Sequence, residues 1–399
     1  MLLVSKSSKK IYLDYASTTP VDPRVLKVML PYFSDNFGNS TSFHEKGAKA
    51  SKIVEESREK IAKIIGSKPN EIIFTSSATE SNNLALKGIA WANKHRGKHI
   101  IISSIEHDCV LNSAKWLETQ GFEVTYLPVD KNGFVLLKDL KKAVKKDTIL
   151  VSIIHGNNEI GTVQDIRAIG EFCRKNNIYF HTDGAQSFGK VPINVEKDFI
   201  DLLTISSHKI YGPLGVAILY KRGGVSIIPL LHGGGHENTF RSSTVNVAGV
   251  VGFVKAAEIC NRNMQNGNKE NKTIAKLKDK LIKGILKKIP DTKLNGDPTQ
   301  RLANNINITF SFIEGESLLL ELNMAGVYVS TGSACSSNSL SPSHVLMALG
   351  KNAEDAHGSI RFSLGRWTKE SDIDYVLQVL PGIVKRLRSM SPFARNRKV

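Results

Sequence analysis

Short apolar runs recur through the middle of the chain, and most of them end in a group of polar residues. The runs are almost continuously apolar rather than alternating, a pattern typical of strands buried on both faces of a parallel sheet. Amphipathic stretches with the period of a helix, such as residues 135–144 and 165–176, separate several of them. This alternation predicts βαβ units and a doubly wound sheet. The predicted strands are residues 99–104, 122–127, 148–154, 177–183, 201–207 and 216–220.

The pattern changes close to residue 262. Residues 261–272 are rich in asparagine and lysine, which indicates a surface break, and a helical stretch follows at residues 273–289. We therefore predict two domains. The predicted division is a large α/β domain at residues 21–261, a smaller α+β domain at residues 262–399 together with 11–20, and a flexible start or very short targeting segment at residues 1–10.

Composition and charge narrow the range of functions. The chain of 399 residues has an ordinary globular composition and no apolar run close to the roughly 18 residues that span a bilayer. Its net charge is +17, but the basic residues are scattered and form no nucleic-acid-binding motif. Neither a membrane nor direct nucleic-acid contact is therefore expected. The cysteines form no CxxC pair, so we expect free thiols, a reducing compartment and no metal site.

Polar side chains follow four of the predicted strands at the point where each strand ends. His107 follows the strand at residues 99–104, and Asn158 follows the strand at residues 148–154. The next two strands contribute Asp183, Gln186, Ser206, His208 and Lys209. Because the carboxyl ends of parallel strands meet at one edge of a sheet, these residues are expected to surround a single ligand site.

Asp183 and Lys209 follow neighbouring strands, and this pair points to one cofactor. Pyridoxal phosphate needs a lysine that forms a Schiff base and an acid that keeps its ring nitrogen protonated. A lone pair of this kind is usually a salt bridge. The serine- and threonine-rich turn before Thr79, taken alone, fits a helix cap as well as a phosphate site. Together with His107 and the other strand-end side chains, the pair indicates a pyridoxal-phosphate site.

A series of longer motifs carries a family resemblance. The chain contains, in this order, YLDYASTTPVDPRV, FTSSATESNNLA, EHD, NNEIG, HTDGAQSFGK, SHKIYGP, HGGGHE, STGSACSSNSLSPSHVLMALG and SIRFSLGRWT. Their order and spacing closely resemble those of the NifS/IscS-like cysteine desulfurases, in the class V aminotransferase family, over about residues 11–393. The resemblance implies pyridoxal-phosphate fold type I, with a mixed, mostly parallel sheet in the large domain and a smaller α+β domain. It also implies a homodimer, because Thr244 matches a threonine that reaches the phosphate from the other subunit.

The resemblance assigns roles residue by residue. It makes Lys209, Cys335 and His107 catalytic, as Schiff-base lysine, nucleophile and ring-stacking proton carrier. It assigns the substrate carboxylate to Arg361, with Asn158 beside the substrate. The implied cofactor-binding residues are Ala78, Thr79, His107, Asn158, Asp183, Gln186, Ser206, His208, Lys209 and Thr244.

Cys335 lies in STGSACSSNSL, a run with almost nothing to bury. We expect it on an exposed loop, although free cysteines are usually buried. The family role implied for it explains this position, since the thiolate would take sulfur from cofactor-bound L-cysteine and carry it outward as a persulfide. The implied acceptors are an iron–sulfur scaffold protein and other sulfur acceptors, including those of tRNA thiolation, and the persulfide would contact an iron–sulfur cluster in transit.

Other interpretations stay open at this point. A selenocysteine lyase or another fold-type I aminotransferase would use the same cofactor, and a non-catalytic assembly subunit would keep only the fold. Ser77 and Ser243 stand where the resembling motifs have glycine, so cofactor binding would suffer if those turns require a positive φ. The basic ending KRLRSMSP and the acid-free start suit a mitochondrion or a mitochondrion-derived organelle, with the cytoplasm as the alternative.

Overall fold

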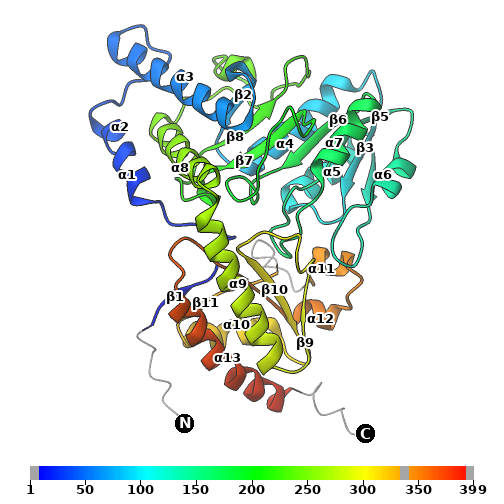
Figure 1. The fold of residues 1–399 in the computed structure, drawn as a ribbon. Coiled ribbons are helices and arrows are strands. Elements are labelled where there is room, and N and C mark those ends of the chain that lie inside the picture. Colours follow the sequence, from blue (N-terminus) through cyan, green and yellow to red (C-terminus); the bar gives the residue numbers. More distant parts are fainter. Residues whose placement is uncertain (1–8, 333–340, 392–399) are drawn as a thin grey trace.

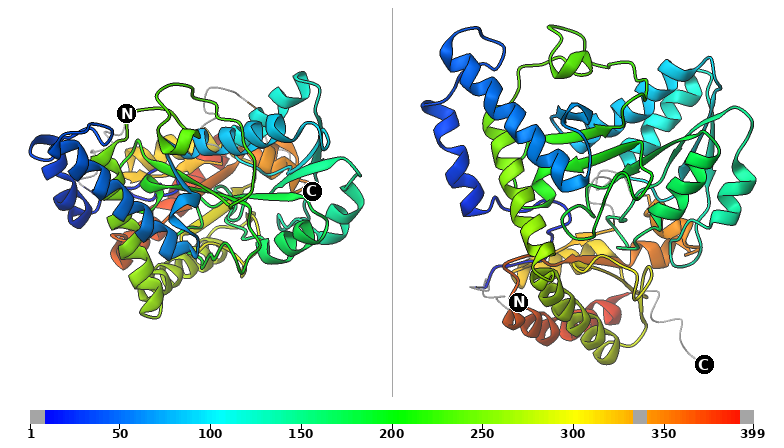
Figure 2. Two further views of the ribbon diagram at one scale, coloured as in Figure 1. Left: turned by 90° about the horizontal axis from the view of Figure 1, so that it is seen from above. Right: turned by 45° about the horizontal axis from the view of Figure 1, so that its top comes forward.

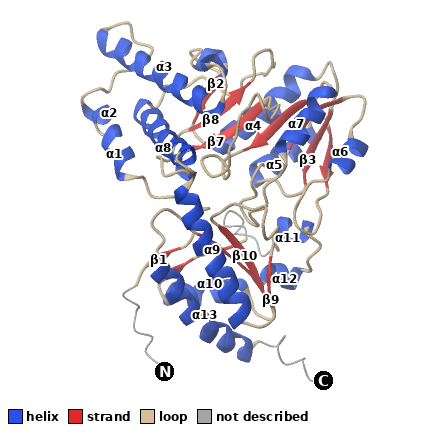
Figure 3. Cartoon of the chain, viewed as in Figure 1, coloured by secondary structure: helices blue, strands red, loops and turns tan. Residues whose placement is uncertain are grey.

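The structure is a computed structural model that describes residues 9–332 and 341–391. Cys335 therefore lies outside the described residues, as do most of the predicted N-terminal segment and the last eight positions. The described chain forms a larger and a smaller body, each built around its own sheet (Figure 3).

The larger sheet has seven strands in the order β2-β8-β7-β6-β5-β3-β4 (Figure 1). Neighbouring strands from β7 to β4 are parallel, whereas β8 is antiparallel to both β2 and β7. The sheet is therefore mixed and mostly parallel, as predicted. Its strands are β2 (Ile72–Thr75), β3 (His99–Ser103), β4 (Glu123–Leu127), β5 (Thr148–Ser152), β6 (Tyr179–Asp183), β7 (Leu202–Ser206) and β8 (Ala217–Lys221).

Side chains on the central strands alternate between two buried faces. Ile101 and Val151 pack with α3, α7 and α8, whereas Ile100, Ile102 and Leu150 pack with α4 and α5. Helices lie on both sides of the sheet (Figure 2), so both faces select apolar residues and the strands read as continuous apolar runs. These helices are α3 (Glu45–Ile65), α4 (Ala78–Asn93), α5 (Asp108–Thr119), α7 (Ile166–Lys175) and α8 (Val247–Gln265).

One predicted strand differs from this description. The run at residues 122–127 was expected to be buried, but β4 is an edge strand, and Glu123 and Tyr126 are exposed. An edge strand has a neighbour on one side only and is less completely covered, so a partly apolar run is sufficient there. The remaining elements around this sheet are α1 (Pro23–Met29), α2 (Pro31–Ser34), η1 (Pro69–Glu71), α6 (Leu137–Ala143), η2 (Ser207–Lys209) and η3 (Glu237–Thr239).

The smaller body is built on an antiparallel sheet in the order β12-β13-β10-β9. β1 pairs in parallel with β11, and Ile11 and Leu13 join a core with α9, α10 and α13. The N-terminal segment thus belongs to the same core as the C-terminal part of the chain. The elements are β1 (Ile11–Tyr12), α9 (Lys269–Lys288), β9 (Thr292–Leu294), β10 (Asn305–Phe310), α10 (Gly315–Met324), β11 (Val327–Tyr328), β12 (Ser330–Thr331), α11 (His344–Ala348), α12 (Ala353–His357), β13 (Ser359–Ser363) and α13 (Glu370–Met390).

The helices α8 and α9 connect the two bodies (Figure 1). α8 continues past residue 262 to Gln265, and Gly267 and Asn268 adopt positive φ before α9 begins. The break in the helix therefore falls just after the boundary expected from sequence. Cys260 on α8 joins the core of the larger body, and Ile274 on α9 joins that of the smaller one. In the part of the chain that the structure describes, no helix combines the length and apolar character needed to cross a membrane.

Candidate active site

A cavity of about 270 Å³ lies where the two bodies meet, at the carboxyl ends of the parallel strands. Most of its walls come from segments that follow β3, β5, β6 and β7. Arg361 on β13 and His344 on α11 come from the smaller body. The lining residues are Ala16, Ser17, Ser77, Ala78, Thr79, Glu106, His107, Asp108, Cys109, Ile154, Asn158, Glu159, Asp183, Ala185, Gln186, His208, Lys209, His344 and Arg361.

The cavity brings together most of the residues that the sequence singled out. Three predicted residues are not part of this wall. Ser206 is buried at the end of β7, Thr244 is exposed on the segment between η3 and α8, and Cys335 lies outside the described residues. The predicted residues that line the cavity are Ala78, Thr79, His107, Asn158, Asp183, Gln186, His208, Lys209 and Arg361.

Lys209 ends the short helix η2, directly after β7. Its Nζ donates hydrogen bonds to the carbonyl oxygens of Ala16 and Ser17, each at 2.6 Å. Gln186 Nε2 donates to the same Ala16 oxygen at 2.8 Å. The segment after β1, which the sequence did not mark as part of the site, therefore holds the amine in place.

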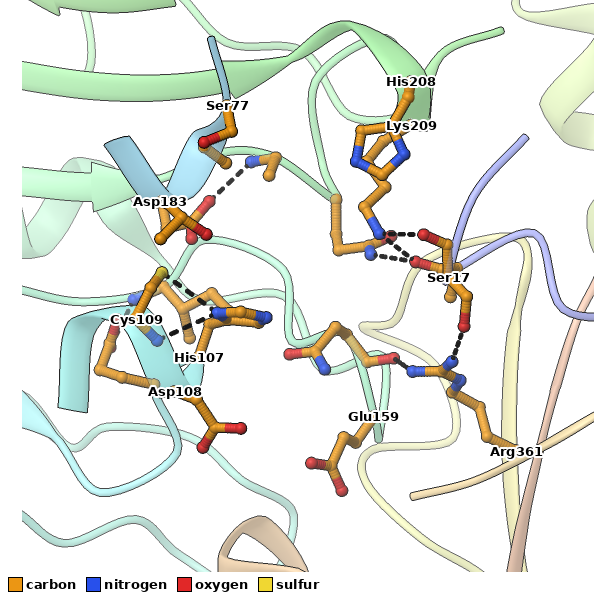
Figure 4. A pocket seen from close by; sticks show the side chains of 18 of the residues that line it. Ser17, Ser77, His107, Asp108, Cys109, Glu159, Asp183, His208, Lys209 and Arg361 are labelled. Atoms are coloured by element: carbon orange, nitrogen blue, oxygen red, sulfur yellow. Dashed lines mark hydrogen bonds between the residues drawn. The ribbon is translucent and has the colours of Figure 1, made fainter. Parts of the chain in front are cut away.

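Asp183 and His107 lie across the cavity from Lys209 (Figure 4). Asp183, the last residue of β6, is 4% exposed and accepts hydrogen bonds from Asn82 Nδ2 at 2.7 Å and from the Ala185 amide at 2.8 Å. His107 caps α5, and its Nδ1 accepts the Cys109 amide at 3.2 Å.

The N-terminus of α4 forms one end of the cavity. Ser77 is its N-cap, and the Ser77 hydroxyl accepts the Glu80 amide at 3.1 Å. Ser77 has a φ of −162°, which is extended backbone open to any residue. Ser243 is likewise absent from the positive-φ positions of the described chain. Neither serine therefore has a backbone conformation that requires glycine. The backbone gives no reason to expect weaker cofactor binding at these two turns.

His208 lies near the same end, and its Nδ1 pairs with the Thr18 hydroxyl at 3.1 Å. Burial, followed by the nearby charges of Lys209 and Lys190, lowers the pKa of His208 to about 4. The ring is therefore neutral at physiological pH. It can donate one hydrogen bond to an anion, but it adds no positive charge.

Arg361 is 2% exposed and forms part of the opposite wall. Its Nη2 donates to Asp14 Oδ1 at 3.0 Å and to Ser17 Oγ at 2.8 Å, and its Nη1 donates to the Asn158 carbonyl at 3.2 Å. The Asp14 carboxylate supplies the opposite charge that a buried guanidinium requires. A substrate carboxylate could contact two nitrogens of this guanidinium at once, which the single bond to Asp14 does not do.

Two buried acids in the wall were missed from sequence. Glu106 is fully buried, its Oε1 accepts the Ile154 amide at 2.7 Å, and burial raises its pKa to about 8. Burial also raises the pKa of Glu159, which accepts a hydrogen bond from Ser343 Oγ at 2.5 Å. Both residues stand inside quoted motifs, EHD and NNEIG. Only the fold shows that these carboxyl groups are enclosed.

The donor set of the cavity fits pyridoxal phosphate. A carboxylate lies on one side for a ring nitrogen, an amine lies opposite it (Figure 4), and the first residues of α4 line an end suited to a phosphate. The N-terminus of α4 is not the only feature that suits a phosphate at this end of the cavity, because the neutral His208 ring lies beside it. Among the described residues, no cluster of three or more His, Cys, Asp or Glu side chains is suited to a metal ion.

Known proteins resemble this chain over almost all of its length. The model of the aminotransferase class-V family matches residues 11–376. The chain is 55% identical over 389 residues to the cysteine desulfurase IscS of Methanosarcina thermophila, covering 98% of this chain and 95% of that protein. It is 49% identical over 392 residues to a probable mitochondrial cysteine desulfurase of Dictyostelium discoideum, covering 98% and 86%. The solved structure of a NifS-like protein matches with a TM-score of 0.88 at 39% identity, covering 95% of this chain and all of that one.

Proposed function

The chain belongs to the aminotransferase class-V family, and from this premise we propose the chemistry of its cavity. The enzyme is a cysteine desulfurase, which removes sulfur from L-cysteine and leaves L-alanine. The predicted family, fold class and enzyme class are confirmed by these relatives. The observation that carries the proposal is the meeting of Lys209, Asp183, His107 and Arg361 around one cavity.

Pyridoxal 5′-phosphate is the cofactor that we propose for this cavity. When bound, it supplies the electron sink that stabilises negative charge at Cα of an amino acid. Asp183 would hold a proton on the ring nitrogen, and Lys209 would be the point of covalent attachment. His107 would stack on the ring, and Gln186 and Asn158 would lie beside the ring hydroxyl.

The phosphate would be held at the start of α4. Among the described residues, no group accepts a hydrogen bond from the amides of Ala78 and Thr79, so both are available as donors there, and neutral His208 would add one hydrogen bond. Ser206 keeps its assignment as a further phosphate ligand. Thr244 is exposed and outside this cavity, which supports its proposed contact with the phosphate in a second copy of the chain and hence a homodimer.

The substrate residues follow from charge and position. Arg361 would exchange part of its contact with Asp14 for the carboxylate of L-cysteine, and Asn158 would lie beside the substrate. Lys209 would remove the Cα proton, and His107 would carry protons at the reacting sulfur and carbon.

Sulfur transfer needs a thiol nucleophile, and we propose Cys335 for this role. An S–S bond forms between the Cys335 thiolate and the substrate sulfur, while the Cβ–S bond breaks. The carbon skeleton takes up protons and leaves as L-alanine. L-cysteine and one thiol therefore give L-alanine and one persulfide, with atoms and electrons balanced.

The acceptors and the compartment belong to the same proposal. The persulfide would supply an iron–sulfur scaffold protein and other sulfur acceptors, including those of tRNA thiolation. We propose a mitochondrion or mitochondrion-derived organelle, supported by the 49% identical relative that is named mitochondrial. The cytoplasm is the alternative, since relatives of similar identity come from archaea and bacteria.

Mass spectrometry after addition of pyridoxal phosphate and L-cysteine, without reductant, tests the function. The expected result is one extra sulfur on the peptide that contains Cys335, with an equal amount of alanine in solution. Cys335→Ser should abolish the sulfur adduct, whereas Cys173→Ala, which changes a buried thiol elsewhere, should retain it.

Other outcomes separate the remaining interpretations. Pyruvate, ammonia and sulfide in solution, with no sulfur on Cys335, would indicate a lyase that eliminates sulfide directly. A strong preference for selenocysteine over cysteine would indicate a selenocysteine lyase. Transfer of the amino group to a keto acid would indicate an aminotransferase. Bound cofactor without any turnover would indicate a non-catalytic assembly subunit.

A further inference from the structure

Cys109 lines the cavity beside His107 and belongs to none of the groups that would hold the cofactor or the substrate. It lies in the first turn of α5, two residues after His107, and its side chain lines the cavity. The residue is only 9% exposed, and the Cys109 sulfur faces the His107 ring (Figure 4). Cys173 and Cys260 are also buried, but neither lines this cavity.

The hydrogen bonds around this thiol fix where its proton lies. The Cys109 amide donates to His107 Nδ1 at 3.2 Å, so that nitrogen carries a lone pair rather than a proton. The Cys109 sulfur is 3.1 Å from the same Nδ1. Since Nδ1 is an acceptor, the thiol must be the donor in this contact.

Asn82 completes the arrangement from the neighbouring helix, α4. It is fully buried, and its Nδ2 donates to the Cys109 sulfur at 3.1 Å and to Asp183 Oδ2 at 2.7 Å. The sulfur therefore accepts from Asn82 and donates to His107. The Asn82 amide group thus links Cys109, which contacts His107, to Asp183, the aspartate assigned to the cofactor nitrogen.

We propose that Cys109 is a positioning residue that fixes His107 in the tautomer with its proton on Nε2. The inference rests on the proposed function only for its catalytic consequence. Two donors from residue 109 converge on Nδ1, and in Figure 4 the other ring nitrogen points toward the middle of the cavity. A neutral His107 therefore presents an N–H to the reacting atoms and acts first as a proton donor.

The first experiment reads the tautomer directly. The full-length, cofactor-loaded protein with 15N-labelled histidine is studied by long-range 15N–1H correlation at about pH 8, where an ordinary imidazole is neutral. His107→Gln identifies the His107 signals by their loss. The expected wild-type pattern is an unprotonated Nδ1 and a protonated Nε2.

Two substitutions distinguish the effect of the hydrogen bond to Nδ1 from the effect of the sulfur atom itself. Cys109→Ser keeps a donor to Nδ1 and should keep the wild-type tautomer, with activity within about twofold of wild type. Cys109→Ala leaves only the amide donor to favour an unprotonated Nδ1, so an Nδ1-protonated form should become detectable beside the Nε2-protonated one, and kcat should fall about fivefold with little change in KM. Cys173→Ala is the matched control for loss of a buried thiol and should change neither readout.

The outcomes are distinct from those of the function test. A protonated Nδ1 in the wild-type protein, or a Cys109→Ala variant with unchanged tautomer and unchanged kcat, overturns the inference. If Cys109→Ala fails to fold, the wild-type spectrum and Cys109→Ser still decide. The expected tautomers in a protein that makes no alanine would refute the proposed function and leave the tautomer assignment standing.

Discussion

The two walls of the cavity present their functional groups in different ways. On the large-sheet wall, Lys209 and His107 lie just beyond the ends of parallel strands and Asp183 is the last residue of one, where the backbone ladder is complete and side chains can vary. On the small-sheet wall, Arg361 lies inside β13 and pairs with Asn307 of β10. A charged side chain in the middle of a strand is buried against the rest of the sheet. Its hydrogen-bond and ion-pair partners must therefore come from other segments of the chain.

The walls also treat buried charge differently. The buried guanidinium of Arg361 is paired with the Asp14 carboxylate, which lies 3.0 Å away. Glu106 on the large-sheet wall accepts hydrogen bonds from Ser103 and from the Ile154 amide, and its Oε2 has no hydrogen-bond partner in the described chain. It therefore avoids the cost of a buried charge by holding its proton up to about pH 8. Arg361 is thus paired with an opposite charge, whereas Glu106 is neutralised by its own proton.

The largest effect is expected on the large-sheet wall, from Lys209→Ala. Removal of the amine eliminates both the attachment point and the base that we propose for the Cα proton, so alanine production should fall by about 10²- to 10⁴-fold. Cofactor absorbance and alanine release measure the change. Lys175→Ala removes an exposed lysine paired with Glu171 and should leave both unaffected. Retention of more than a tenth of the activity would exclude Lys209 as the base.

A smaller effect is expected on the small-sheet wall, from Arg361→Lys. The variant keeps the positive charge but loses the planar fork, so kcat/KM for L-cysteine should fall about 10- to 100-fold, mainly through KM. Steady-state kinetics measure it, and Arg386→Lys, which changes an exposed arginine on α13, is the control. A fall in kcat alone would mean that Arg361 positions neighbouring groups and does not bind the carboxylate.

The same contrast explains how much of the site could be predicted from sequence. Residues at strand ends follow recognisable apolar runs, so the pattern alone predicts Lys209, Asp183 and His107 as site residues, without any family resemblance. Asp14 and Arg361 are far apart in sequence, and no local pattern connects them. The support that Asn82 gives to Asp183 also depends on how α4 packs, which the periodicity of a helix does not specify.

The smallest effect, which also tests the contrast in buried charge, is expected from Glu106→Gln. The pKa of Glu106 is raised from its ordinary value of 4.5 to about 8, so between these values the folded state binds more protons than the unfolded state. Stability must therefore fall as pH rises through this window, by at most about 1.4 kcal/mol per pH unit from this group. Glutamine can still accept the hydrogen bonds from Ile154 and Ser103, but it does not titrate.

The difference in unfolding free energy between Glu106→Gln and wild type isolates this group, because Glu159 titrates in the same direction in both proteins. Urea unfolding at several pH values between 5 and 8 should show the variant gaining stability relative to wild type as pH rises. Glu59→Gln changes an exposed carboxyl and should give a constant difference over this range. A constant difference for Glu106→Gln as well would mean that Glu106 is ionised in the folded protein at neutral pH. The contrast between the paired Arg361 and a neutral Glu106 would then be lost.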